Sequence, residues 1–276
     1  MLSTRDIQRK IRTVRNIQQI CRAMKTVSSI KLRKAEERIL AARPYADALR
    51  TMVMRLGAGG ETSHPLLQTR EVEKAGVIAI SADKGLAGSF NTNLLREAIA
   101  LAKSTPDVRV IPIGRKIADA YRREDFDIYT SLAPLGNEAE FRTIAAIADQ
   151  VGADYIAGVF DRVDLIYTQY GGRVTTMQLL PIQPPEGEEA SGSFIFEPNP
   201  EAILEQLMPR YLRTVLFTAV LSSIAAEHAA RVAAMSLATD NADDLISRLT
   251  MDYNKSRQSS ITGELTDIVG AAEALK

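Results

Sequence analysis

The C-terminal stretch from Pro209 to Lys276 constrains the fold more than any other part of the chain. It contains no further proline, and its first glycine is Gly263. Such a long run without a helix breaker predicts one helix. At 1.5 Å per residue this helix would be about 90 Å long. A helix of that length needs a partner, because an amphipathic helix is stabilised chiefly by packing its apolar face.

The start of this helix is marked twice. Asn199-Pro200-Glu201 supplies an N-cap, a proline at the first helical position and an acid in the first turn. Pro209 offers a second start, since a proline inside a helix removes a hydrogen bond and kinks the chain. We therefore expect a short helix over 200–208 and a long helix after it.

An apolar stripe runs along the long helix at intervals of three or four residues. Its members are Val215, Thr218, Leu221 or Ser222, Ala225, Ala229, Val232, Met235 or Ser236, Thr239, Ala242, Ile246, Leu249 and Tyr253. A mean spacing near 3.5 predicts a left-handed coiled coil. Because the centre of the stripe is rich in alanine, the partner backbone can approach closely.

Residues 3–56 predict the partner helix, with Ser3 or Thr4 as its cap and Gly57 after its end. Its apolar positions are Ile7, Ile11, Val14, Ile17, Cys21, Met24, Val27, Ile30 or Lys31, and Ala35. One helix enters the intervening body and the other leaves it, so the two should run antiparallel. The last 15 to 20 residues of the C-terminal helix should then extend past the N-terminal one, and its apolar members are Ile261, Leu265, Ile268, Val269 and Leu275.

The residues between the two helices alternate between strand and helix patterns. Strands are expected over 75–81, 108–113 and 155–160, helices over 91–103, 115–123 and 138–151, and a hairpin over 163–182 around Gly171-Gly172. Such alternation predicts a βαβ unit with a partly parallel, Rossmann-like sheet. The predicted domains are thus an N-terminal coiled-coil helix (1–56), an α/β globular domain (57–199) and a C-terminal coiled-coil helix (200–276).

Few residue patterns indicate catalysis or metal binding. The glycine-bearing turn 81–91 follows a strand, but it matches no phosphate-binding motif, so a turn capped by Ser89 or Asn91 is the simpler interpretation. Asp161 and Asp164 fit a solvated turn better than a carboxylate pair. His64 and His228 are the only histidines and lie far apart, which argues against a metal site or a catalytic triad.

Charge is distributed unevenly although the whole chain is neutral. Residues 1–56 carry 14 Lys and Arg against 4 acids, a net charge of +10. This charge leaves nucleic acid, anionic lipid or an acidic protein as possible partners. Nucleic acid and lipid are disfavoured because the charges are spread around the helix and Tyr45 is the one aromatic residue among them. No apolar run approaches the roughly 20 residues of a membrane span.

Several segments carry a resemblance to a known family over nearly the whole chain. They are Ile20–Val27 with Lys31–Ala35, Asp83–Asn91, Glu227–Met235, Ala238–Ala242, Tyr253–Gln258 and Ile261–Thr266. In this order they resemble the γ subunit of F-type ATP synthases. That family has two long antiparallel helices forming a coiled coil, with an α/β domain between them.

The resemblance implies a rotating central stalk that has no catalytic activity or cofactor of its own. Its implied partners are the α and β subunits of the catalytic hexamer, the ε subunit and the c-ring of the membrane sector, with no nucleic acid. Proton flow through the c-ring would turn the shaft and drive ATP synthesis at the β subunits, or the reverse. The implied location is the cytoplasmic face of a bacterial plasma membrane, with an organellar inner or thylakoid membrane as the alternative.

The resemblance also implies seven stator-contact residues. These are Met24, Lys25, Arg231, Arg257, Gln258, Thr262 and Glu264. Met24 and Lys25 would face an acidic segment of the β subunit. Two alternatives stay open from the residues alone, an α/β enzyme and a basic coiled-coil adaptor.

Overall fold

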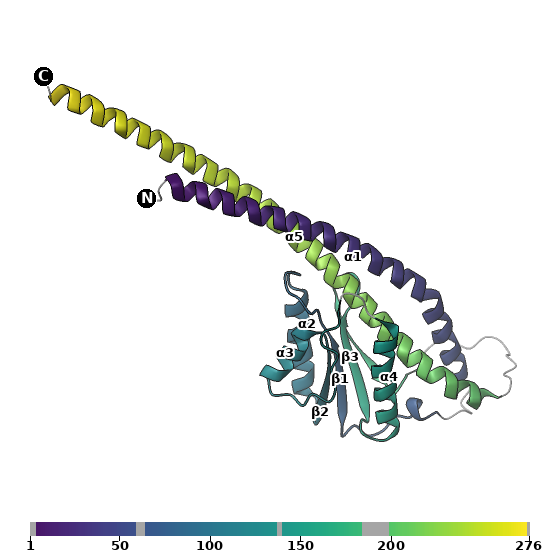
Figure 1. Ribbon diagram of the computed structural model, residues 1–276. Coiled ribbons are helices and arrows are strands. Elements are labelled where there is room, and N and C mark those ends of the chain that lie inside the picture. The colour runs from purple at the N-terminus through teal and green to yellow at the C-terminus, as the bar shows by residue number, and fades with distance from the viewer. Residues whose placement is uncertain (1–3, 59–63, 137–139, 184–198, 275–276) are drawn as a thin grey trace. The chain divides into compact units, whose positions relative to one another are not determined.

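The computed structural model describes residues 4–58, 64–136, 140–183 and 199–274 (Figure 1). The elements in chain order are α1 (Thr4–Ala58), the 3-10 helix η1 (Pro65–Leu67), β1 (Ala75–Ile80), α2 (Phe90–Ser104), β2 (Val108–Ile113), α3 (Arg115–Arg123), α4 (Phe141–Ile156), β3 (Arg162–Thr168), β4 (Val174–Leu180) and α5 (Pro200–Ala274). The predicted fold class, two long terminal helices with an α/β sheet between them in sequence, is confirmed.

The chain forms two compact units. One combines Met1–Ser29 with Arg231–Lys276, and the other is Ile30–Ala230. Both long helices contribute residues to each unit. The division into domains 1–56, 57–199 and 200–276 assigns each long helix to one domain and stays a prediction.

The unit Ile30–Ala230 is built on a four-stranded sheet with the strand order β2-β1-β3-β4. β1 pairs in parallel with β2 and with β3, and β3 and β4 form the predicted antiparallel hairpin. All six residues of β1 are buried, as expected for a central strand covered on both faces.

Helices cover both faces of the sheet, with α2 and α3 on one side and α4 on the other (Figure 1). Val77, Ala79 and Ile166 pack with apolar residues of α2 and α3. On the opposite face, Ile78, Ile80 and Leu165 belong to a larger core that includes α4 and the first part of α5. Alternate residues of one strand therefore serve two separate cores.

The unit made of Met1–Ser29 and Arg231–Lys276 is an antiparallel helix pair. Thr4 pairs with Ser256, Gln8 with Tyr253 and Lys25 with Ser236. Rising numbers on α1 thus meet falling numbers on α5, as predicted.

The buried seam of α1 differs from the predicted stripe at two positions. Ile17 and Val27 are 50% and 52% exposed, whereas the neighbouring residues Gln18 and Ser28 are 7% and 4% exposed. Apolar spacing alone could not distinguish these adjacent positions, and of the two polar side chains at the seam Gln18 has a partner on α5, Asp243. On α5, the predicted Met235, Thr239 and Ala242 are buried.

The C-terminal end of α5 continues past the start of α1. Ser256 is the α5 residue that pairs with Thr4, the first described residue of α1, and α5 runs on to Ala274. Ile261, Leu265, Ile268 and Val269 on this extension are between 49% and 65% exposed. Leu275, also expected there, lies outside the described residues.

The predicted strand over 155–160 is wrong. α4 runs to Ile156, and the next strand begins at Arg162. Ile144, Val151 and Tyr155 are all fully buried at helical spacing, so Tyr155 belongs to the core face of α4. Of the predicted helix 138–151, residues 138 and 139 lie outside the described residues.

The predicted helix break at Pro209 is also wrong, because α5 is one helix that contains Pro209. Leu204, Met208 and Leu212, on both sides of this proline, are at most 1% exposed. Burial of this apolar face offsets the hydrogen bond that proline removes. α1 likewise passes through Pro44.

The sequence predicts no segment apolar enough to span a membrane, and α5 is an exception to that prediction. Among the described residues it alone contains an 18-residue window that would suffice by length and composition. Half of that window is buried within the protein, which is the property of a core helix.

Two buried tyrosines give a test of this core. The Tyr121 hydroxyl has no hydrogen-bond partner among the described residues, and burial raises the pKa of Tyr121. The Tyr155 hydroxyl donates to the Gln68 carbonyl oxygen at 2.6 Å. We expect Tyr121→Phe to leave the free energy of unfolding unchanged or raise it by about 1 kcal/mol, and Tyr155→Phe to lower it by about 1 kcal/mol. Urea unfolding of the two variants measures this, and a larger loss in Tyr121→Phe than in Tyr155→Phe would contradict it.

Candidate functional site

The turn after β1 is braced by the protein's own groups. The Asp83 carboxylate accepts hydrogen bonds from the backbone N–H of Arg115 (3.0 Å), Leu135 (3.1 Å) and Gly136 (2.9 Å). The Asn91 side chain accepts from Ala82 N–H at 3.3 Å and donates to the Lys84 carbonyl oxygen at 3.2 Å. This turn is therefore a structural tie between the loops that follow β1 and β2.

The N-terminus of α3, close to the same turn, is also occupied. Besides the bond from Arg115 to Asp83, Lys116 N–H donates to the Ala82 carbonyl oxygen at 3.1 Å and Ile117 N–H to Ser81 Oγ at 2.9 Å. A phosphate bound at a helix N-terminus needs N–H groups that are free, whereas each of these already donates to an oxygen of the chain. At the start of α2, Ser89 makes no side-chain cap hydrogen bond, so of the two predicted residues, Ser89 or Asn91, it is Asn91 whose side chain bonds across the turn.

The two aspartates near β3 also have structural partners. Asp161 accepts from the N–H of Glu73 (3.2 Å) and Lys74 (2.9 Å). Asp164 lies within β3, is 2% exposed and pairs with Arg162 at 2.9 Å, so its predicted place in a solvated turn is wrong. In the part of the chain that the structure describes, no group of three His, Cys, Asp or Glu side chains is arranged to hold a metal ion.

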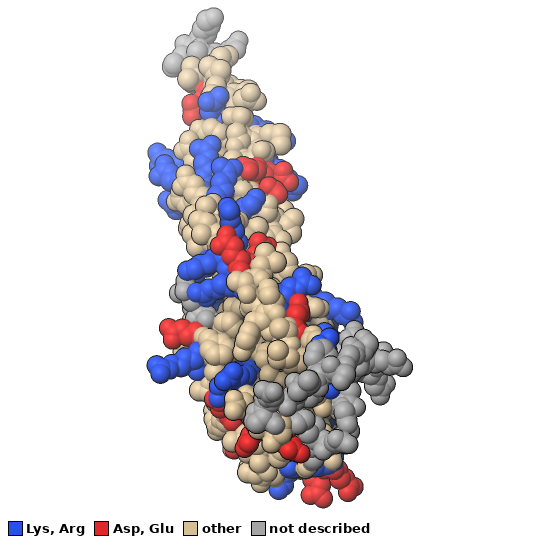
Figure 2. Space-filling model, turned by 90° about the vertical axis from the view of Figure 1, so that its right-hand side faces the viewer, with Lys and Arg blue, Asp and Glu red and all other residues tan. Residues whose placement is uncertain are grey.

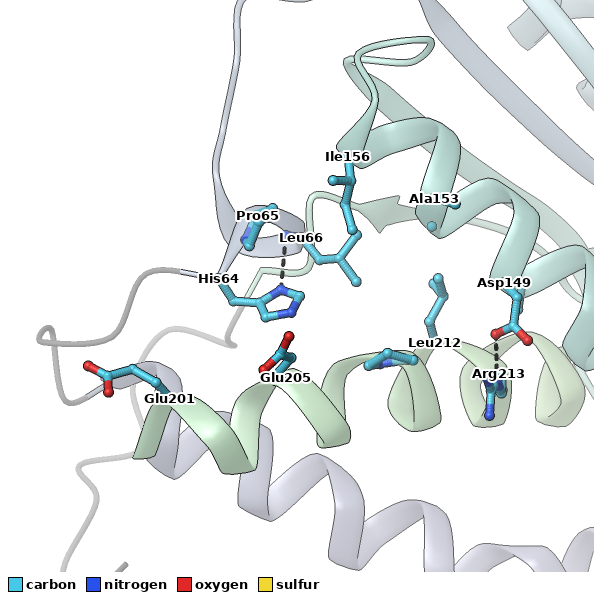
Figure 3. A pocket seen from close by; sticks show the side chains of 13 residues that line it. His64, Pro65, Leu66, Asp149, Ala153, Ile156, Glu201, Glu205, Leu212 and Arg213 are labelled. Atoms are coloured by element: carbon cyan, nitrogen blue, oxygen red, sulfur yellow. Dashed lines mark hydrogen bonds and ion pairs between the residues drawn. The ribbon is translucent and has the colours of Figure 1, made fainter. Parts of the chain in front are cut away.

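A cavity of about 740 Å³ lies between η1, α4 and α5, with His64, Glu205 and Glu201 on one side (Figure 3). His64 Nδ1 accepts from Leu66 N–H at 3.1 Å and so caps η1. Burial lowers the pKa of His64, and the nearby Glu205 carboxylate opposes this shift. At the other end Arg213 donates to Asp149. His64, Asp149 and Arg213 serve local structure, and the polar groups named here form no nucleophile, base and orienting group of a catalytic set.

Of the seven predicted contact residues, Met24 and Lys25 lie on the helix pair. Both are half-buried, and Lys25 Nζ donates to Ser236 Oγ at 3.1 Å. Arg231 is 7% exposed, so most of its side chain is covered by the chain itself.

The other four predicted residues lie on the extension of α5 beyond Ser256. Arg257, Gln258, Thr262 and Glu264 are all exposed. They share this extension with the exposed apolar residues described above. The structure therefore separates the seven residues into groups and does not gather them into one pocket.

On the face shown in Figure 2, charge on the helices does not form a single continuous patch. Figure 2 shows basic side chains in clusters separated by acidic and uncharged ones on the face in view. Residues 4–29 of α1 contain no aromatic side chain. Stacking platforms for nucleic-acid bases are thus missing from this part of α1.

Sequence periodicity missed a polar cluster in the helix pair. The side chain of Gln18 donates to Asp243, and Arg22 Nη2 donates to the same carboxylate at 3.2 Å. The available signal was a glutamine adjacent to the predicted seam residue Ile17. Nothing in the sequence indicated that its partner would lie 225 residues away.

Comparison with known proteins identifies the family. The family model described as ATP synthase matches residues 3–275. The chain is 42% identical over 284 residues to the ATP synthase gamma chain of Pelotomaculum thermopropionicum and 43% identical over 282 residues to that of Desulfitobacterium hafniense, with both chains covered completely in each case. The chain belongs to the ATP synthase gamma chain family.

Solved structures agree with this assignment to the gamma chains. The central stalk and c-ring of the Tetrahymena thermophila mitochondrial ATP synthase includes a chain that is 26% identical, with a TM-score of 0.61, covering 79% of this chain and 99% of that one. The rotor of the Euglena gracilis mitochondrial ATP synthase includes a chain with a TM-score of 0.70 at 19% identity, covering 94% and 98%. At 19% identity, the similarity to the Euglena chain shows a shared fold.

The braced turn after β1 generates a stability prediction. Asp83→Ala removes three hydrogen bonds to a charged acceptor, so we expect the free energy of unfolding to fall by about 2–4 kcal/mol. Asp83→Asn keeps one acceptor oxygen and should lose less. Denaturant unfolding of both variants checks this order, and an Asp83→Ala variant as stable as the parent would show that the turn is not held by this carboxylate.

Proposed function

We propose that this chain is the rotating central shaft of a proton-translocating ATP synthase. Its relationship to gamma chains along its full length is the observation that carries the proposal. The antiparallel helix pair supports it, because two wound helices resist bending and twisting better than one helix does. In this role the chain couples proton flow through the membrane sector to ATP synthesis on other subunits, and ATP hydrolysis to proton flow in reverse.

The partners in this proposal are the α and β subunits of the catalytic hexamer, the ε subunit and the c-ring. The similar solved structures support them, since one is a central stalk with its c-ring and the other is a rotor. The chain would be a peripheral component at the cytoplasmic face of a bacterial plasma membrane. Relatives from bacteria support the bacterial location.

The chain has no catalytic role of its own in this proposal. The described cavity and the turn after β1 support it, because their polar groups are engaged in local structure. The alternative of an α/β enzyme depended on that turn. The alternative of a nucleic-acid-binding adaptor depended on the basic charge of α1, which the proposal assigns to contacts with acidic subunit surfaces.

The seven predicted contact residues would meet the stator in two ways. Arg257, Gln258, Thr262 and Glu264 are exposed on the extension of α5 and available to surrounding subunits. Met24 and Lys25 are half-buried and would present only their outer atoms to an acidic segment of a β subunit. Arg231 is mostly covered, so its proposed contact would depend on the small exposed part of its guanidinium.

Reconstitution tests the function directly. We expect the purified chain to hydrolyse no ATP alone, and to restore ATP-driven proton pumping when it is assembled with the α, β, ε and membrane subunits in vesicles. Steady-state ATP turnover by the isolated chain would contradict its non-catalytic role. Failure to assemble with the α and β subunits would contradict the shaft role.

A charge at position 24 tests the proposed stator contact. We expect Met24→Lys to reduce proton pumping per ATP hydrolysed about fivefold, because an added ammonium about 4 Å from a carboxylate of the acidic β segment would attract it by about 1 kcal/mol in water-like surroundings and hold the shaft against the stator. Met24→Leu keeps the size and polarity and is the matched control, with pumping expected near that of the parent. Vesicle acidification measures the pumping. If the two variants pump equally, Met24 makes no contact with the stator.

A further inference from the structure

Polar contacts across the helix pair share one register. The pairs Gln8 with Tyr253, Gln18 with Asp243 and Lys25 with Ser236 lie along the pair, and the two residue numbers in each pair add up to 261. Three separate polar contacts thus specify the same alignment of α1 against α5.

The central contact is the most buried of the three on α1. Gln18 is 7% exposed, at a seam position where a coiled coil ordinarily has an apolar residue. Its amide donates to Asp243 Oδ1, and Arg22, one turn further along α1, donates to Oδ2 of the same carboxylate at 3.2 Å. One acid on α5 therefore binds two consecutive turns of α1.

The rest of the seam is poorly suited to fixing this alignment. Its buried members include Cys21, Ser28, Thr239 and Ala242, which are small and similar in size. Small side chains interlock weakly, so a shift by one turn would leave the apolar packing largely unchanged. The same shift would move Gln18 away from Asp243 and leave a buried amide without a partner, which is costly.

We propose that the contact of Gln18 and Arg22 with Asp243 locks the axial register of α1 against α5. The lock determines which α5 residues lie level with Met24 and Lys25, and how far α5 extends beyond Thr4. Gln18 and Asp243 are thus positioning residues. The lock itself is a property of the folded chain, and only its effect on energy coupling rests on the proposed function.

The ion pair alone would not provide such a lock. The Arg22 and Asp243 side chains are 59% and 55% exposed, and exposed ion pairs contribute little to stability. The specificity comes from the buried amide, because a buried polar group at a coiled-coil seam selects one register at some cost in stability.

The native thiol offers a probe of register. Cys21 is the only cysteine in the chain and is 8% exposed at the seam. By the shared register it lies level with Asp240, next to the buried Thr239. The seam positions Met235, which is buried, and Ile246, which is half-buried, lie more than one turn from that level on either side. Thr239→Cys therefore reports the native register, and Met235→Cys and Ile246→Cys report registers shifted in the two directions.

The test measures cross-linking of the full-length chain with a short thiol-to-thiol reagent, with and without Gln18→Leu. With Gln18 present, we expect cross-links to position 239 and few to positions 235 and 246. With Gln18→Leu, we expect the off-register share to rise about tenfold, because the penalty of an unpaired buried amide is gone. The thermal midpoint should stay the same or rise, since leucine suits the seam better.

A structural role without register selection predicts a different result. Gln18→Leu would then lower the thermal midpoint and leave the ratio of cross-links unchanged, and this result would overturn the proposal.

An exchange of the two groups provides the matched rescue. Gln18→Glu should place two carboxylates face to face and raise off-register cross-linking. Adding Asp243→Asn should restore the native ratio of cross-links. If the double variant does not restore that ratio, the result would also count against the lock.

Assembly with the other subunits separates the lock from the function. If Gln18→Leu shifts the cross-links and also lowers proton pumping per ATP, the lock contributes to coupling. If the cross-links shift and pumping is unchanged, the register selection stands and its link to coupling is refuted. The cross-linking result needs no partner subunit, so it is independent of whether the shaft proposal succeeds.

Discussion

Burial of one face of α5 is the constraint on which the rest of the structure depends. In the unit Ile30–Ala230, Leu204, Leu212, Leu216 and Val220 are at most 1% exposed against the sheet and its helices. Each such side chain contributes roughly 1.5–3 kcal/mol when fully buried. Without these contacts a helix of 75 residues would have no fixed anchor, because helix propensity alone stabilises an isolated helix only marginally. The same helix can then continue through the second unit with α1 as its partner.

The elements with strong periodicity or turn chemistry could be predicted from the sequence. β2 and α3 were placed at their observed bounds, and Gly171-Gly172 identified the hairpin. The errors arose where local preference competes with burial. The residues around Tyr155 have the pattern of a strand, but the Tyr155 ring completes the buried face of α4. Pro209 should break a helix, but α5 continues through it because the leucines around it are buried. A single sequence does not state how much area a segment will bury.

The seven candidate contact residues come from the resemblance, stay a prediction, and have no support from sequence pattern. The seven contact residues are ordinary helix residues, and no spacing rule distinguishes Arg257 or Thr262 from other exposed positions on α5. The contact of Gln18 with Asp243 was missed for a related reason, since the two residues are 225 positions apart. Their pairing depends on the alignment of two helices, which apolar spacing defines only to within about a turn. Apolar pattern predicted the partner helix, and polar chemistry decided its register.

The composition of the helix pair reflects two requirements that oppose each other. Small seam residues such as Ser28, Cys21 and Ala242 bury little area, so each contributes less stability than a leucine would. In return, they let the two backbones approach closely and keep the pair narrow. A narrow pair suits a shaft that turns inside a ring of subunits, as proposed for this chain, but a seam of small residues resists sliding poorly. If α1 slid along α5 under load, part of each rotation would go into that sliding and would not reach the other subunits. Polar contacts that share one register supply the resistance that the small side chains lack, at the cost of removing polar groups from water.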